Sequence, residues 1–484
     1  MSITSNQDPS PESVEPLPEA VPAQGRAEGR SRSGVWALIT RLHFYAGVFI
    51  APFLVLSALT GLAYAFTPQL DQIVYRDELR VERVAGQPRP LADQIAAARA
   101  AHPEGTIGTV GIPAGPGDTT KVVLMLPELG EKQRTVYVDP YTLEVKGALT
   151  TWWGATPLTS WLDELHRSLH LGKAGMVYSE LSASWLWVIV LAGLAMWLGR
   201  RRRYRGSAPA RRALLPDRSD KGVRRTRSRH AALGLWLALG LLFLSATGLT
   251  WAEQAGQRFD RVQSALDSSA PELDTALSAA PAPAGDGHAG HSGHGAASPD
   301  GVLADYDKVL ATARTAGLTG PIDVAAPESA GSAWSVAQTD NTWPVRKDKI
   351  AVDASSGQVT ARVDWADHPF LAQLSALGIQ AHMGLLFGLA NQLVLAALAL
   401  SLLVVIFLGY RTWWRRRPSR DDRRALAGTP PARGAWRRTP WPVLAVGIPV
   451  VVLIGWALPI LGLSLLVFVV IDVLTGIRRR ERAR

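Results

Sequence analysis

The 484-residue sequence contains no cysteine. This absence excludes disulfides, iron–sulfur clusters, thiolate metal sites and covalently attached c-type haem, so any redox centre must be held noncovalently. Several catalytic signatures are also missing: there is no Walker loop, no GxGxxG following a strand, no HExxH and no GxSxG. Enzyme classes that depend on those motifs are therefore excluded.

The sequence does contain several long apolar runs. Four of them are long enough to cross a hydrocarbon core about 30 Å thick, at residues 36–66, 177–198, 231–251 and 382–408. A fifth stretch, 441–477, is too long for one ordinary span and contains Pro449 and Pro459. Arginines flank it on both sides, so an even number of crossings is favoured, and we expect a hairpin broken near Pro459.

The basic residues explain the orientation of these spans. The net charge is +10, yet the Lys and Arg residues are concentrated in the short segments 200–229 and 411–438. Short basic loops stay in the cytoplasm, which places the two long, more acidic loops outside. The sequence thus predicts a multi-pass protein of the cytoplasmic membrane with its N-terminus inside. Topology, rather than affinity for nucleic acid, accounts for the charge.

The two halves of the chain resemble each other. Setting His43 over His230 brings further matches into register without a gap, on two spans of like orientation. The matched positions are Gly47 with Gly234, Thr60-Gly61-Leu62 with Thr247-Gly248-Leu249, and Tyr64 with Trp251. We expect an internal duplication.

The long outer loops repeat as well, each as a small α+β module that ends in a strand hairpin. The first has helical periodicity at 91–101 and β-like runs at 106–113, 121–127, 134–138 and 143–147. The second has a helix at 306–316 and strands at 321–326, 333–338, 349–353 and 359–364.

The predicted fold is a polytopic α-helical membrane protein with four core transmembrane helices, a C-terminal hydrophobic hairpin and two extracytoplasmic modules. The expected segments are a disordered tail at 1–33, spans at 34–67, 166–199, 230–252 and 379–409, modules at 68–165 and 253–378, basic loops at 200–229 and 410–440, the hairpin at 441–477 and a basic tail at 478–484.

Four of the ten histidines occupy equivalent places in the two halves. His43 and His230 lie near the cytoplasmic ends of the first and third spans, and His170-Leu171-Gly172 matches His382-Met383-Gly384 near the outer ends of the second and fourth. Ionisable groups in a bilayer are costly and usually functional. Paired imidazoles at two depths suit the axial positions of two b-type haems, with neighbouring Gly47, Gly234, Gly172 and Gly384 leaving room for a macrocycle.

His166 complicates the outer pair. It lies one helical turn before His170 and shares its face, so it is the outer ligand itself, a second ligand or a partner for a propionate. In this register its counterpart in the second half is Gly378. The symmetry therefore favours His170 without excluding His166.

Other histidines have weaker roles. His288, His291 and His294 form a Gly-rich cluster at 286–295 that suits weak extracytoplasmic binding of Cu, Zn or Ni, or is a solvated linker. His102 and His368 are expected at the surface. The chain has no flavin or nicotinamide domain, so the electron donor must be another protein or a membrane quinol.

The sequence resembles the PepSY-associated transmembrane family, which includes iron-regulated membrane proteins and ferric-siderophore reductases. The resemblance covers about residues 36–410. It rests on LHFYAGVFIAPFLVLSALTGLAYAF at 42–66, ELHRSLHLG at 164–172, RHAALGLWLALGLLFLSATGLTW at 229–251 and AHMGLLFG at 381–388.

The resemblance implies that the outer modules are PepSY domains. It also implies a dihaem protein that passes electrons outward to a ferric siderophore or another metal chelate, with His43, His170, His230 and His382 as ligands and His166 in reserve. Two other functions stay open. One is a nonredox PepSY protein that binds peptides, proteases or metal chelates, and the other is copper or zinc handling at His288, His291 and His294.

Overall fold

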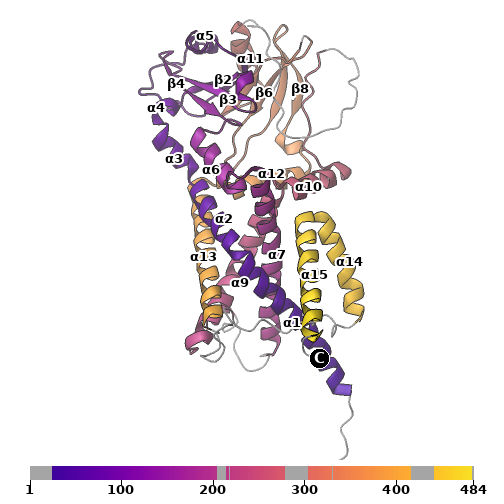
Figure 1. Ribbon diagram of the computed structural model, residues 1–484. Coiled ribbons are helices and arrows are strands. Elements are labelled where there is room, and N and C mark those ends of the chain that lie inside the picture. Colours follow the sequence, from indigo (N-terminus) through magenta and orange to yellow (C-terminus); the bar gives the residue numbers. More distant parts are fainter. Residues whose placement is uncertain are drawn as a thin grey trace, which may run out of the picture.

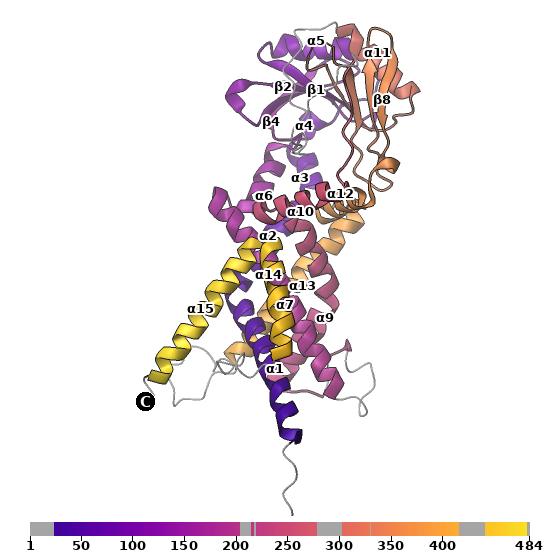
Figure 2. The same cartoon turned by 90° about the vertical axis from the view of Figure 1, so that its right-hand side faces the viewer.

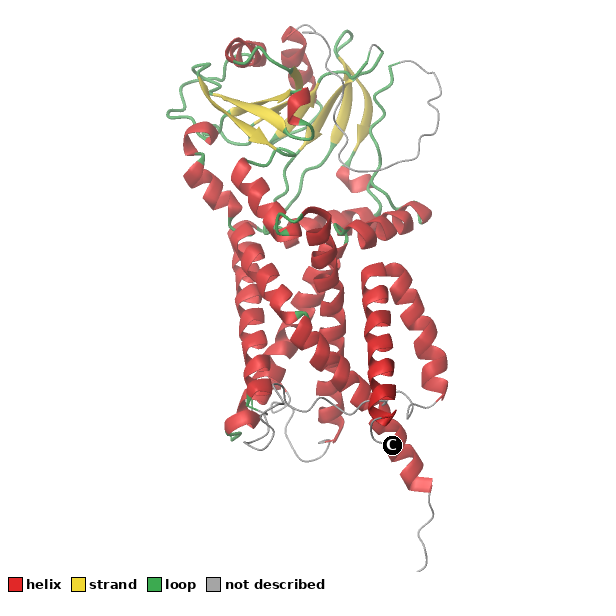
Figure 3. Cartoon of the chain, viewed as in Figure 1, coloured by secondary structure: helices red, strands yellow, loops and turns green. Residues whose placement is uncertain are grey.

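A helical bundle and a β-sheet body stacked on one end of it make up the computed structural model (Figure 1). The structure describes residues 24–203, 214–216, 219–277, 303–329, 331–415 and 441–481. Figure 3 shows the separation of the two parts, with the long helices below and all the described strands above.

The two outer modules share one antiparallel sheet, in the order β4-β3-β2-β1-β5-β6-β7-β8. The strands are β1 (Thr106–Ile112), β2 (Thr120–Met125), β3 (Gln133–Val138), β4 (Val145–Thr151), β5 (Ile322–Ala325), β6 (Trp334–Gln338), β7 (Lys349–Asp353) and β8 (Gln358–Val363). Strands of the two modules meet where β1 pairs antiparallel with β5, with Val110 opposite Val324. The four strands expected in each module are present. The strands of each module form one half of a continuous sheet.

A single hydrophobic core extends under both halves of the sheet. Alternating β-branched residues on the inner face are fully buried, as in Val110, Val122 and Val324. Helices α5 (Leu91–Ala101) and α11 (Leu303–Thr315) cover that face, and Ile95 and Val309 insert into the same core. Because both modules contribute to one core, neither half of the sheet is packed independently of the other.

Three described helices are long and apolar enough to cross a membrane: α7 (Gly172–Arg203), α9 (Gly222–Leu249) and α13 (Gly388–Trp414). A fourth span is formed if α1 (Gln24–Phe49) and α2 (Ala51–Tyr64) count as one, since they meet at a bend of 55°. Helix α1 starts at Gln24, so residues 24–33 are helical rather than part of the expected tail, whereas residues 1–23 lie outside the described chain.

Pro52 explains the bend between α1 and α2. A proline lacks the N–H that bonds to the carbonyl four residues earlier, and its ring clashes with that carbonyl. The freed carbonyl is that of Val48, and the hydroxyl of Tyr410 on α13 donates a hydrogen bond to it at 2.8 Å. The equivalent helix of the second half, α9, has Leu239 at the matching position and runs without a break.

Short helices occupy the junction between the sheet and the bundle (Figure 2). They are α3 (Thr67–Val74), α4 (Arg76–Leu79), α6 (Pro157–Ser168), α10 (Glu253–Ala265) and α12 (Phe370–His382), with a 3-10 turn at Trp365–Asp367. A second 3-10 turn, Pro127–Leu129, connects β2 to β3 and packs Leu129 against the core of the sheet. The second and fourth spans were expected to include the histidine segments, at 166–199 and 379–409. Instead the chain breaks before α7 and before α13, so His166 and His382 lie on separate short helices.

Left-handed backbone conformations cause the first of these breaks. Leu169 and His170 have φ values of 52° and 56°. Non-glycine residues in this region end a helix rather than continue it. His166 and His170 are consequently not on one helical face, contrary to the expectation from their spacing.

The C-terminal stretch forms two helices, α14 (Trp441–Ala457) and α15 (Pro459–Glu481), which turn at Leu458 as expected from Pro459. Near the turn the backbones approach so closely that a Cβ added at Gly462 would lie 2.7 Å from the Cα of Gly455. Trp185 of α7 donates from Nε1 to the hydroxyl of Ser464 at 2.8 Å, which fixes α15 against the bundle.

The Tyr410–Val48 hydrogen bond gives a test of the bend. Replacing Tyr410 by Phe leaves the Val48 carbonyl without its donor, so the free energy of unfolding should fall by about 1–3 kcal/mol. Denaturant or thermal unfolding in detergent measures the change. Tyr45→Phe is the matched control, because its hydroxyl has no hydrogen bond within the described chain. Equal stability of both variants would contradict the role assigned to Tyr410.

Candidate functional site

Two histidines face each other at the end of the bundle remote from the sheet, and we call them the sheet-distal pair. His43 lies on α1 and His230 on α9, and their ring centres are 6.2 Å apart with an interplanar angle of 76°. The histidines matched in the sequence are therefore neighbours in space.

Each ring of this pair is held through the same nitrogen. Nδ1 of His43 lies 2.9 Å from the carbonyl oxygen of Ile189 on α7, and Nδ1 of His230 lies 2.9 Å from that of Val405 on α13. A carbonyl oxygen only accepts hydrogen bonds, so Nδ1 must carry the proton in both neutral rings. The unprotonated Nε2 of each ring is left for another partner.

Glycines make these contacts possible. Gly193 and Gly409 follow the two carbonyls by one helical turn, and a Cβ at either position would lie 3.3 or 3.4 Å from the Cε1 of His43 or His230. Gly47 and Gly234, which follow the histidines themselves, have open space around the position of a Cβ.

The second set, which we call the sheet-proximal pair, consists of His166 on α6 and His382 at the end of α12. Nδ1 of His166 lies 2.9 Å from the hydroxyl oxygen of Thr60, and Nδ1 of His382 lies 2.7 Å from that of Thr247. A Cβ at Gly61 or Gly248, the residues after these threonines, would lie 3.0 or 3.4 Å from the corresponding Cε1.

The threonine hydroxyls determine the proton positions here too. Thr60 donates its hydroxyl hydrogen to the carbonyl of Leu56 at 2.9 Å, and Thr247 donates to that of Phe243 at 2.8 Å. Because a hydroxyl has one hydrogen, each threonine accepts from the Nδ1–H of its histidine. All four rings are therefore held at Nδ1.

Burial also keeps the sheet-proximal rings uncharged. It lowers the pKa of both His166 and His382 to about 4, and in His382 the nearby His166 lowers it further. Both imidazoles are neutral at pH 7, which is the form that binds a metal ion.

His170 has a different environment. It lies in the left-handed turn after α6, its side chain is 31 % exposed, its Nδ1 is 3.4 Å from the carboxylate of Glu164, and its ring centre is 5.1 Å from that of Trp161. The histidine that makes the same contact as His382 is therefore His166 and not His170, which differs from the expected pairing of His170 with His382 and of His166 with Gly378.

A different offset along the chain identifies the equivalent residues. The same separation, 216 positions, relates His166 to His382, Ile189 to Val405, and Gly193 to Gly409. Matching the glycines in the middle of the spans would have revealed this register. The similarity of the HLG and HMG tripeptides concealed it.

The remaining expected residues take no part in either pair. Gly172 and Gly384 have φ values of 55° and 82° and shape the turns before α7 and α13. His102 lies 3.1 Å from the carboxylate of Glu104, and His368 is largely buried beside Trp365. The cluster His288, His291 and His294 lies outside the described residues, and within the described chain no group of three or more His, Cys, Asp or Glu forms a metal site.

Helix α6 is attached to α3 by side-chain hydrogen bonds. Asp71 accepts from the hydroxyls of Thr156 and Thr159 at 2.7 and 2.8 Å, and the backbone N–H of Leu158 donates to the hydroxyl of Tyr75 at 3.1 Å. These bonds hold the N-terminal turn of the helix that carries His166.

The helix that carries His382 is held from α13. The side-chain amide of Asn391 donates to the carbonyl of Ala381 at 2.9 Å. Gln392, which is 2 % exposed, accepts from the amide of Gln69 on α3 at 2.7 Å. Helix α3 therefore bonds to the supports of both sheet-proximal histidines.

The fold and these positions define a multi-pass membrane protein of α-helices with an antiparallel sheet outside its candidate spans. The chain belongs to the family described as the PepSY-associated TM region, whose model matches residues 40–416 and so includes both histidine pairs. The resemblance seen in the sequence is confirmed. No curated protein matches the chain.

The attachment of α6 to α3 leads to a prediction. Asp71→Ala removes the acceptor of two threonine hydroxyls, so amide hydrogen exchange in α6 should accelerate while exchange in α5 stays unchanged. Asp77→Ala, an exposed acid on α4, is the control and should change neither helix. Unaltered exchange of α6 in the Asp71 variant would contradict the assigned role.

Proposed function

We propose that this protein binds two b-type haems and carries electrons across the membrane to a ferric chelate at its outer face. The sheet-distal pair, His43 and His230, holds one haem, and the sheet-proximal pair, His166 and His382, holds the other. The observation that carries the proposal is the geometry of the sheet-distal rings.

The spacing of that pair suits two axial ligands of one iron. A metal–imidazole bond is about 2 Å and a ring centre lies about 1 Å behind its nitrogen, so two axial rings have centres about 6 Å apart. The rings of His43 and His230 are 6.2 Å apart. Open space at Gly47 and Gly234 supports the presence of a flat macrocycle beside them.

The protonation of the four histidines also supports ligation. A ligating histidine nearly always donates its other ring N–H to a nearby acceptor, which fixes its tautomer and makes it more basic. Here the acceptors are two backbone carbonyls and two threonine hydroxyls. When bound, haem iron supplies a one-electron couple between its ferric and ferrous states. The chain's own residues orient the rings and keep water from them.

We further propose that the two halves arose by duplication, with four core spans. The repeated contacts support this: His43 with α7 and His230 with α13, Thr60 with His166 and Thr247 with His382. The basic loops support an orientation with the sheet outside the cell membrane, in which the sheet-proximal pair is the outer one. Electrons then move outward, from a cytoplasmic or quinol donor to an extracytoplasmic acceptor.

Haem content in histidine variants tests the proposal. The purified protein should show a Soret band that shifts on reduction and a haem-to-protein ratio of about two. Alanine at His43 or His230 should remove one haem, and alanine at His166 or His382 should remove the other. Absorption spectra with haem and protein assays measure the ratio. A colourless protein from haem-replete cells would refute haem binding and favour a nonredox role.

Matched controls separate ligands from their neighbours. His170→Ala should retain both haems, because His170 lies on the exposed turn. Thr60→Val removes the acceptor for Nδ1 of His166, together with the bond of that hydroxyl to the Leu56 carbonyl, and should weaken haem retention about 10- to 100-fold at the sheet-proximal site. Thr412→Val deletes a hydroxyl that bonds only to the carbonyl of Leu408, and should have no effect. Loss of haem in the His170 variant, with retention in the His166 variant, would reverse the assignment.

Electron transfer to the acceptor is tested separately. Protein reduced with dithionite and freed of excess reductant should be reoxidised anaerobically by a ferric hydroxamate chelate, forming one ferrous ion per electron released. The absorption of oxidised haem and a ferrous-specific dye measure both sides of the reaction. Stable reduced haem in the presence of the chelate would exclude this substrate class while leaving haem binding intact.

A further inference from the structure

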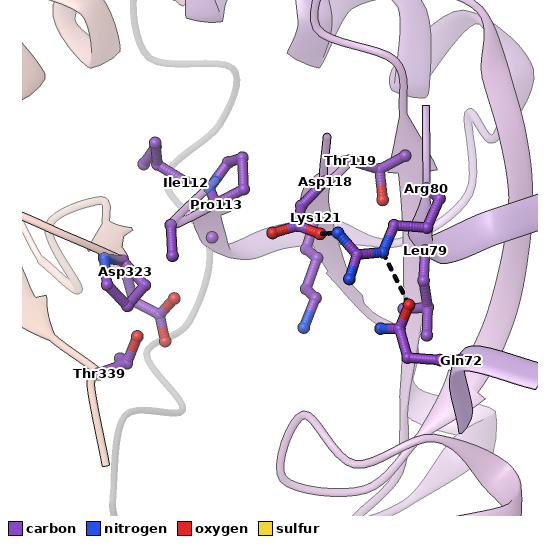
Figure 4. Close-up of a pocket in the computed structure, with 13 residues that line it drawn as sticks. Gln72, Leu79, Arg80, Ile112, Pro113, Asp118, Thr119, Lys121, Asp323 and Thr339 are labelled. Atoms are coloured by element: carbon purple, nitrogen blue, oxygen red, sulfur yellow. Dashed lines mark hydrogen bonds and ion pairs between the residues drawn. The ribbon is translucent and has the colours of Figure 1, made fainter. Parts of the chain in front are cut away.

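A cavity of about 300 Å³ lies where the two halves of the sheet meet (Figure 4). Its wall comes from both modules: the end of β1 and the loop after it, the start of β2, the start of β5 and the residue after β6. Another side is closed by Gln72 of α3, Leu79 of α4 and Arg80, the residue after α4. Cavities of this size hold small molecules.

Two of the four charged groups in the wall are already paired with each other. The guanidinium of Arg80 lies 2.5 Å from the carboxylate of Asp118, and its Nε donates to the amide oxygen of Gln72 at 2.7 Å. These partners are joined by the dashed lines in Figure 4. They form part of the wall and leave Lys121 and Asp323 as the charges open to a ligand.

Lys121 and Asp323 lie in one row across three neighbouring strands. In the sheet register Gly111 of β1 is opposite Lys121 of β2 on one side and opposite Asp323 of β5 on the other. Neighbouring strands are about 5 Å apart, so the cation and the anion start about 10 Å apart at the backbone. No ion pair within 4 Å joins either of them to another residue of the described chain.

Gly111 has no side chain and so leaves room beside it for both charged residues, and the stem of Lys121 passes within 4 Å of the position that a Cβ would take. A Cβ added there would lie 3.1 Å from the carboxylate oxygen Oδ1 of Asp323 and 3.5 Å from the Cβ of Lys121. Any larger residue would fill the gap in the row. In Figure 4 the carboxylate of Asp323 points into the cavity.

The carboxylate of Asp323 is half-buried and has no hydrogen bond or ion pair within the described chain. Burial raises the pKa of Asp323 to about 6, and the charge of Lys121 opposes that shift only in part. A hydrogen-bond donor or a cation on a ligand would compensate for the lost hydration.

We infer that this cavity binds a small zwitterion of amino-acid or dipeptide size over Gly111. The carboxylate of the ligand bonds to the Lys121 ammonium, and its own ammonium bonds to Asp323. A molecule with both charges engages both groups at once, whereas a simple anion or cation engages only one of them. The inference does not depend on haem binding.

Calorimetry on the full-length protein in detergent tests the site, with L-alanyl-L-alanine and L-alanine as probes. At least one of them should bind saturably. N-acetylation or C-terminal amidation of that probe removes one charge, and each should weaken binding at least about tenfold. Because these analogues leave the protein unaltered, this comparison does not depend on whether a variant folds.

Variants provide the second comparison. Lys121→Met and Asp323→Asn should each weaken binding of the free probe at least about tenfold, while Lys132→Met, at an exposed position of the same module, should not. Asp323→Asn should also abolish the preference for the free amine over the acetylated analogue. Absence of saturable binding of either probe up to about 10 mM overturns the inference. Equal binding of free and capped probes also overturns it.

Discussion

The hydrogen bond at Nδ1 of each core histidine is the constraint on which the rest of the site depends. An imidazole that donates from Nδ1 has one lone pair left, on Nε2, and its ring plane is fixed by the acceptor. Four rings meet this condition through two different acceptors, backbone carbonyls at one end of the bundle and threonine hydroxyls at the other. Each acceptor comes from a neighbouring helix, so the helix packing determines the chemistry of the rings.

The sheet and the bundle are mechanically connected through short helices rather than through the spans themselves. Helix α3 is central to this connection, because Gln69 bonds to Gln392, Asp71 bonds to α6, and Gln72 lines the cavity at the meeting of the two modules. Three nearby residues of one helix thus contact the supports of both sheet-proximal histidines and the wall of the cavity. The shared hydrophobic core holds the modules together above this junction.

The two halves repeat the contacts of their histidines but differ elsewhere in the bundle. Pro52 bends the first span, and the second half has no proline at the matching position of α9. The Val48 carbonyl freed by the bend is bonded by Tyr410 of the other half. The bend therefore leaves the Val48 carbonyl with a hydrogen-bond donor. An unpaired carbonyl in an apolar environment would cost several kcal/mol of free energy, about as much as other unsatisfied backbone groups there.

Much of this architecture was determined by the local sequence. Apolar runs, strand alternation and the break at Pro459 predicted the helices, the two sets of four strands and the C-terminal turn, because these patterns reflect burial of one face or one span.

The identity of the fourth core histidine was not determined locally. His166 and His170 have equally suitable side chains, and only the left-handed turn at Leu169 and His170 directs one toward Thr60 and leaves the other exposed. The joining of β1 to β5, and with it the row of Lys121, Gly111 and Asp323, depends likewise on a contact between residues more than 200 positions apart. Sequence periodicity describes each element by itself, whereas such pairings are decided by tertiary packing.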